Sequence, residues 1–87
     1  MTPNGEFLVA DTGNNAIRAV TGEGTVRTLA GNGKAGFAAG QGSSARFNSP
    51  RGMAMDLDGS LLVADSGNNA IRRVTMEGVV STFVIRP

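Results

Sequence analysis

The chain has 87 residues, with eight lysines and arginines against seven acidic residues and with neither cysteine nor histidine. This composition excludes disulfides and removes the usual zinc ligands and the usual general base at neutral pH. A net charge of +1, spread over both signs, argues against nucleic acid as a partner. A core of this size is marginal by itself, so oligomerisation is the support that remains.

The first residues lack the basic and apolar regions of a signal peptide, and no apolar run is long enough to span a membrane. The sequence therefore predicts no membrane partner and a cytoplasmic location by default.

The strongest feature is an internal repeat. Residues 4–28 and 58–82 match at about 17 of 25 aligned positions, roughly 54 residues apart. Units of a repeat architecture cannot bury their apolar faces alone, and about three or more are normally needed for stability. This chain carries fewer than two, so something else must cover the remaining faces.

Short runs of β-branched and apolar residues predict the strands in chain order. The first repeat offers three strands, at residues 7–11, 16–20 and 26–30. The second offers four, at 52–56, 61–65, 70–74 and 79–84, joined by turns at Asp58-Gly59, 66–69 and Glu77-Gly78. We expect an all-β chain of antiparallel meanders.

Residues 31–36 satisfy the pattern G-x-G-x-x-G after a strand, which is typical of dinucleotide-binding loops. The residues that follow are too glycine-rich to open a helix, and no βαβ unit surrounds them. We interpret this segment as a loop that crosses between the two repeats.

The residues now resemble the NHL repeat family, whose members form β-propellers with one four-stranded sheet per blade. The resemblance rests on the glycines of 31–36, on the pattern Ala-x-Phe-x-x-Pro-x-Gly at 45–52, and on the strand that ends in Asp65 before Gly67-Asn68. It implies an incomplete blade at 1–31 that lacks its inner strand, a blade-crossing loop at 32–49 and a full blade at 50–87. Both ends cut across a repeat, so we expect a truncated fragment of a longer repeat protein.

A closed propeller of this family needs about six blades, and this chain supplies about two. Closure by copies of the chain is therefore expected, with a homotrimer preferred and a homotetramer as the alternative. The missing inner strand leaves the edge of strand 7–11 unpaired, which invites strand addition by another chain. The channel could instead be plugged by residues 1–4 or by the tail 84–87.

Asp11 and Asp65 each end a strand before Gly and two Asn residues. They could coordinate a hard cation such as Ca²⁺. The stronger interpretation is a carboxylate that accepts hydrogen bonds from the main chain of its own turn, since the motif occurs in both repeats. Arg18 and Arg72 share one repeat position, where packing with the guanidinium on a carboxylate is the commoner role than ligand binding.

In a meander, the crossing segment and the turns after Asp11 and Asp65 lie at one end of the sheets. This end collects polar residues that could orient a small molecule over a central channel, although a solvated rim without a ligand remains open. The predicted ligand-binding residues are Arg46, Asn48, Arg51, Asn14 and Asn68.

Two functions follow. The first is a self-assembling binding or scaffold module with a polar site at the channel. The alternative is a weak hydrolase of activated esters, lactones or phosphotriesters, which the resemblance to six-bladed propeller hydrolases implies. With no histidine or cysteine, no nucleophile and base pair is evident, and the catalytic residues stay unassigned.

Overall fold

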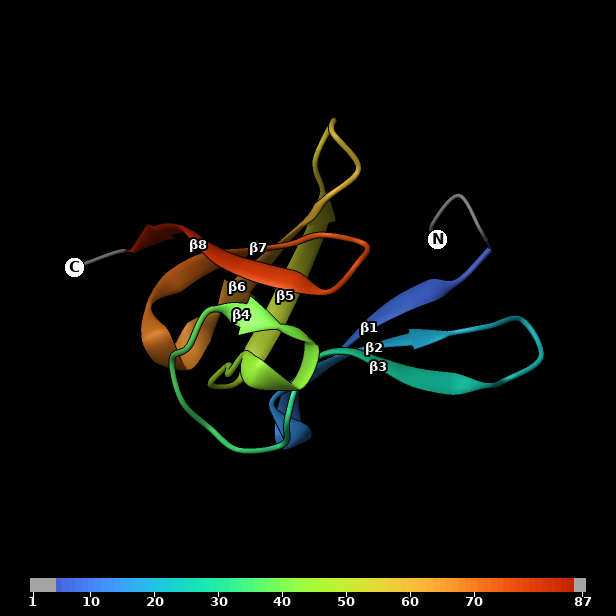
Figure 1. Ribbon diagram of the computed structural model, residues 1–87, viewed down its shortest axis with the longest axis horizontal. Helices are drawn as coiled ribbons and strands as arrows, with labels where there is room; N and C mark the ends of the chain where they lie inside the picture. Colours follow the sequence, from blue (N-terminus) through green and yellow to red (C-terminus); the bar gives the residue numbers. More distant parts are fainter. Residues whose placement is uncertain (1–4, 86–87) are drawn as a thin grey trace.

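The computed structural model describes residues 5–85, which form two antiparallel sheets and contain no α-helix (Figure 1). The first sheet has the order β1 (Phe7–Asp11), β2 (Ala16–Val20) and β3 (Val26–Gly31). The second has the order β4 (Gly40–Gln41), β8 (Val79–Ile85), β7 (Ala70–Val74), β6 (Leu61–Asp65) and β5 (Pro50–Met55). The predicted all-β architecture of about two blade-like sheets is confirmed.

One strand was not predicted from the sequence. β4 lies inside the segment expected to be only a crossing loop, and it pairs with β8 through Gly40 and Gln41 to make a fifth strand. Two residues carry too little alternation to be recognised as a strand. The proposed boundaries at residues 31 and 49 stay predictions. Of the predicted plugs, residues 1–4 lie outside the described residues, and the described part of the tail 84–87, residues 84 and 85, belongs to β8 and pairs with β7.

The turns that follow Asp11 and Asp65 have the same conformation. The 3-10 turns η1 (Thr12–Asn14) and η3 (Ser66–Asn68) each end in an asparagine with left-handed backbone, Asn15 at φ 52° and Asn69 at φ 50°. A short amide side chain tolerates that region better than most residues do. The turn predicted at 66–69 is therefore present, and the first repeat has the same turn after Asp11.

Both sheets also carry a bulge at the same repeat position. The register shifts between Ile17 and Arg18 and again between Ile71 and Arg72, which leaves Leu29 and Phe83 as the additional residues on the partner strands. A bulge re-aims the side chains that follow it. The repeat therefore reproduces strand irregularities as well as strands.

The core lies between the two sheets. Ile17, Leu29 and Ala30 of the first sheet pack with Leu61, Val63, Val74 and Val80 of the second. Ala45 and Phe47 of the crossing segment, both fully buried, complete this cluster. A third 3-10 turn, η2 (Gly42–Ser44), precedes them.

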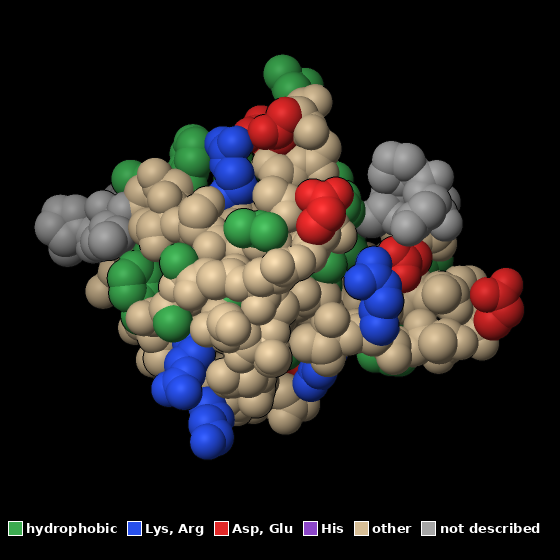
Figure 2. Space-filling view, in the orientation of Figure 1, with side chains coloured by type: hydrophobic (Ala, Val, Ile, Leu, Met, Phe, Trp, Pro, Cys, Tyr) green, Lys and Arg blue, Asp and Glu red, His purple; other side chains and the backbone are tan. Residues whose placement is uncertain are grey.

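No helix among residues 5–85 is long and apolar enough to cross a membrane. Figure 2 shows lysine and arginine side chains dispersed over the visible face rather than gathered into one patch.

Candidate functional site

The second sheet holds a completely buried ion pair at its loop end. Arg72 Nη1 donates to Asp65 Oδ2 at 2.9 Å, and both side chains have no exposed surface. Charges taken out of water in this way require further hydrogen bonds to offset the loss of hydration. The crossing segment supplies them.

Residues 36–48 of that segment, here named the clamp segment, wrap the guanidinium. Arg72 Nη1 also donates to the carbonyl oxygen of Arg46 at 2.9 Å, and Nη2 donates to the carbonyl oxygen of Ala38 at 2.8 Å. The rings of Phe37 and Phe47 lie 4.6 and 5.3 Å from the guanidinium carbon, within the range of cation–π attraction. Within the described residues only Arg72 Nε lacks a hydrogen-bond partner among buried side-chain polar atoms.

The carboxylate of Asp65 is fixed by the same segment. Its Oδ1 accepts the main-chain N–H of Asn48 at 2.7 Å, and its Oδ2 accepts the amide of Asn68 at 2.8 Å. The acceptor role of Asp65 is confirmed, but the expected donor was wrong. The main-chain N–H comes from the clamp segment, 17 residues away, and not from the turn of Asp65 itself.

The turn η3 of the second sheet also forms hydrogen bonds to the clamp segment. The N–H of Gly67 donates to the carbonyl oxygen of Asn48 at 2.7 Å, and Asn68 Nδ2 donates to that of Gly36 at 2.8 Å. A Cβ on Gly67 would lie 2.4 Å from the side-chain carbon of Asn48. Only glycine therefore allows the clamp segment to approach this turn so closely.

The first sheet repeats this site without the cover. Arg18 Nε donates to Asp11 Oδ2 at 3.0 Å, and Arg18 Nη1 donates to the hydroxyl of Thr28. The side chains of Arg18 and Asp11 keep 27% and 32% of their surface exposed, whereas their counterparts keep none. The hydrogen bonds from Asn14 and then from Arg18 hold the pKa of Asp11 below its usual value.

The predicted packing role of the two arginines is thus confirmed, since each guanidinium lies on the aspartate of its own repeat. Arg73 is held differently: it pairs with Asp56 and Asp58 and lies over the ring of Phe83.

The predicted ligand residues are distributed over three places. Asn48 and Asn68 meet at Asp65, and Asn14 donates to Asp11 at 3.1 Å in the first sheet. The side chains of Arg46 and Arg51 are exposed, and neither forms a hydrogen bond within residues 5–85. The structure joins the asparagines to the two ion pairs rather than to a common cavity, so the ligand set stays a prediction.

A metal site at Asp11 or Asp65 also stays a prediction. Residues 5–85 contain no cluster of three or more acidic, histidine or cysteine side chains that could hold a metal ion. Both carboxylate oxygens of Asp65 already accept hydrogen bonds.

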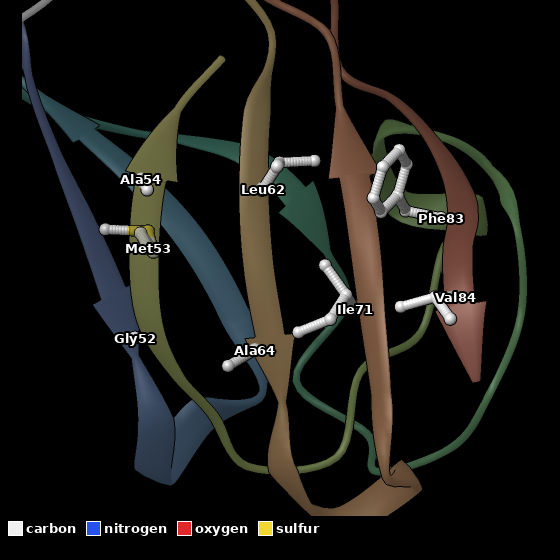
Figure 3. Close-up of a pocket in the computed structure, with 8 residues that line it drawn as sticks. All are labelled: Gly52, Met53, Ala54, Leu62, Ala64, Ile71, Phe83 and Val84. Atoms are coloured by element: carbon white, nitrogen blue, oxygen red, sulfur yellow. The ribbon is translucent and has the colours of Figure 1, made fainter. Parts of the chain in front are cut away.

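An apolar hollow of about 410 Å³ opens on the outer face of the second sheet. Figure 3 shows the residues of β5, β6, β7 and β8 that line it. It is lined by Gly52, Met53, Ala54, Leu62, Ala64, Ile71, Phe83 and Val84. Sequence reasoning missed this surface, although the repeat offset could have identified it, because five of these residues are the counterparts of core residues in the first sheet.

The outer face of the first sheet is open as well. Phe7, Val9 and Val26 are 51%, 43% and 59% exposed, while their counterparts Leu61, Val63 and Val80 are buried. Each sheet therefore has one apolar face in the core and one apolar face in solvent.

Comparison with known proteins agrees with this architecture. The family model described as NHL repeat matches residues 47–74, which agrees with the resemblance predicted from the sequence. No curated protein matches the chain.

Among solved structures, an auxiliary nutrient binding protein from Bacteroides thetaiotaomicron superposes with a TM-score of 0.79 at 20% identity. The match covers 91% of this chain and 22% of that one. A structural genomics protein of unknown function from the same organism has a TM-score of 0.80 at 25% identity, over 88% of this chain and 20% of that one. An auxiliary nutrient binding protein from Bacteroides ovatus has a TM-score of 0.76 at 20% identity, over 91% and 22%. The chain spans about a fifth of the length of these structures, and the likeness establishes the fold.

Proposed function

We propose that this chain is a self-assembling binding and scaffold module, in which copies pack side by side through their two open sheet faces. The observation that carries the proposal is the correspondence between the buried interface inside one copy and the two surfaces that the copy leaves open.

The inner face of the first sheet is one half of that interface. It is formed by Leu8, Ala10, Ile17, Leu29 and Ala30, which pack in or against the core. One repeat later the same positions are Leu62, Ala64, Ile71, Phe83 and Val84, which line the open hollow. The hollow therefore has residues similar to those of the inner face of the first sheet, and that inner face packs against a sheet in this molecule.

The inner face of the second sheet is the other half, and its counterpart is the open face around Phe7, Val9 and Val26. The open hollow of one copy thus matches the open face of the next in the way that the two sheets match inside each copy. This contact joins two different surfaces. Such contacts generate a closed ring when the rotation that relates one copy to the next brings the last copy back onto the first. A homotrimer would supply six sheets and a homotetramer eight.

The open faces carry larger side chains than the buried ones. Phe83 stands where the inner face has Leu29, and Phe7 stands where the other inner face has Leu61. Inside one copy, Phe47 of the clamp segment fills space between the sheets. The clamp segment would be absent from the contact between two copies. The rings of Phe83 and Phe7 would fill the corresponding volume in that contact, which favours a second copy as the partner of these faces.

The binding role rests on the loop end of the sheets. A ring of copies would bring the exposed Arg46 and Arg51 of each copy to one rim, where they could orient a small polar ligand. Two of the structures with this fold are auxiliary nutrient binding proteins, so the architecture serves binding in those proteins. No observation within residues 5–85 favours the hydrolase alternative.

The test is the mass of the purified chain by sedimentation, for the wild type, Ile71→Glu and Leu57→Glu. Ile71 lines the hollow, whereas Leu57 is fully exposed at a hairpin turn and serves as the matched control. We expect the wild type and Leu57→Glu to have the mass of three copies and Ile71→Glu to be monomeric, because a carboxylate placed in an apolar interface costs several kcal/mol. A folded wild-type monomer at concentrations of about 100 μM would contradict the proposal, since stable interfaces form well below that concentration.

A further inference from the structure

We propose that the uncovered ion pair of the first sheet is a binding site for an extended, aromatic-containing peptide segment of a partner molecule. The site would hold this peptide as the second sheet holds its own clamp segment. It lies on the same face of the first sheet as Phe7 and Val9, beside the surface that a second copy would cover, but the argument for it uses contacts within one copy and goes beyond the assembly described above.

The first argument is that the same residues are present in both sheets. Asp65, Gly67, Asn68 and Arg72 bind the clamp segment, and one repeat earlier the chain has Asp11, Gly13, Asn14 and Arg18. In the second sheet these four residues hold the segment through the carbonyl oxygens of Gly36, Ala38, Arg46 and Asn48 and the N–H of Asn48. Every one of these peptide groups is main chain, so the recognition chemistry requires an extended backbone rather than one particular sequence.

The second argument is that two of the atoms that would hold the ligand have no other partner. In the second sheet, Nη2 of Arg72 and Oδ1 of Asp65 contact only the clamp segment. In the first sheet, Nη2 of Arg18 and Oδ1 of Asp11 form no hydrogen bond within residues 5–85, while Nε and Oδ2 hold the pair together. The free donor and acceptor are thus two of the atoms that a peptide would use, while Nη1 of Arg18 donates to the hydroxyl of Thr28.

The third argument is space. A Cβ on Gly67 would collide with Asn48 of the clamp segment, whereas a Cβ on Gly13 would meet nothing within 4 Å. The point of closest approach in the second sheet is therefore open beside the first, and the glycine that permits such an approach is present.

The ligand chemistry follows from the clamp segment. Two phenylalanine rings cover the guanidinium of Arg72, so an aromatic residue in the peptide would cover the exposed guanidinium of Arg18. Beyond the clamp segment the chain continues as β5, which pairs with β6. The corresponding edge of β1 has no pairing strand within the described residues, so the bound peptide can continue as an added strand.

The experiment titrates a fluorescent synthetic peptide with the sequence of residues 36–55 into the purified chain and follows its anisotropy. The variants are Gly13→Ala, which fills the empty volume, and Arg18→Met, which keeps the apolar stem and removes the donors. Arg73→Met is the control, because Arg73 lies in the second sheet on Asp56 and Asp58. A peptide with the Phe47→Ala change tests the role of the aromatic ring.

We expect saturable binding to the wild type and to Arg73→Met, with a loss of about tenfold or more for Gly13→Ala, for Arg18→Met and for the altered peptide. Circular dichroism and thermal melting check that each variant folds, and Gly13→Ala keeps the test valid if Arg18→Met does not fold.

Absence of saturable binding at about 1 mM peptide, which corresponds to roughly −4 kcal/mol, would overturn the proposal. Equal binding by Gly13→Ala and the wild type would overturn it as well, since the peptide would then bind elsewhere. Repeating the titration with Ile71→Glu separates this site from assembly, because Ile71 lies in the hollow and not at the ion pair of the first sheet.

Discussion

Gly13 and Gly67 occupy the same position in two turns of nearly the same sequence, yet their surroundings differ completely. Beside Gly67 lie the side chain and the carbonyl oxygen of Asn48, whereas the space beside Gly13 is open. The same contrast separates the buried pair of Asp65 and Arg72 from the partly exposed pair of Asp11 and Arg18. At this scale, the residue type sets what a position can bind, and a distant segment determines whether it is bound.

The paired glycines give a direct test of this difference. Gly67→Ala should lower the free energy of unfolding by about 1 to 3 kcal/mol, because the added methyl group forces the clamp segment away from the turn. Gly13→Ala should change it by less than about 0.5 kcal/mol, since the methyl group enters open space. Urea denaturation of both variants measures these values, and equal losses would show that the clamp segment does not press on the second turn.

The clamp segment links the two repeats and packs between their sheets. It contributes Ala45 and Phe47 to the core, covers Arg72 and leads into β5. The G-x-G-x-x-G residues 31–36 lead into this segment from β3, and the short strand β4 rather than a helix follows them. Tertiary contacts give this segment its structure, because four of its main-chain carbonyls accept hydrogen bonds from β7 or from the turn η3.

Its two aromatic rings should differ in importance. Phe47→Ala should destabilise the chain by about 3 to 5 kcal/mol, since it removes a fully buried ring and uncovers the guanidinium of Arg72. Phe37→Ala should cost much less, because Phe37 is 49% exposed. Chemical denaturation curves compare the two variants, and similar losses would argue against Phe47 as the centre of this core.

As a whole molecule, the chain has one buried sheet interface and two open apolar faces that correspond to its halves. A protein of 87 residues without disulfides buries a small core, and a joint that covers both faces would stabilise each copy. Assembly and folding are therefore expected to be linked in this protein.

This linkage predicts a melting temperature that rises with protein concentration. A tenfold increase should raise it by a few degrees, because association stabilises the folded state by mass action. Leu57→Glu should behave as the wild type does, whereas Ile71→Glu should melt at a lower temperature that is independent of concentration. Calorimetry over a hundredfold range of concentration tests this, and a constant wild-type melting temperature would speak against assembly.

Much of this protein was determined by its sequence alone. The repeat, the strands and the turns with left-handed Asn15 and Asn69 follow from local patterns, since alternation and turn chemistry act over a few residues. The pairing of each arginine with the aspartate seven positions earlier in the same repeat follows from the register of a meander.

Only the tertiary structure decided in which of the two repeats a given ion pair, turn or sheet face is covered by other residues. The donor to Asp65, the short strand β4 and the hollow around Ile71 all depend on where the crossing segment and the two sheets pack. Two repeats with nearly the same residues differ in burial because burial is a property of neighbours, and the neighbours of a residue in a sheet come from distant parts of the chain.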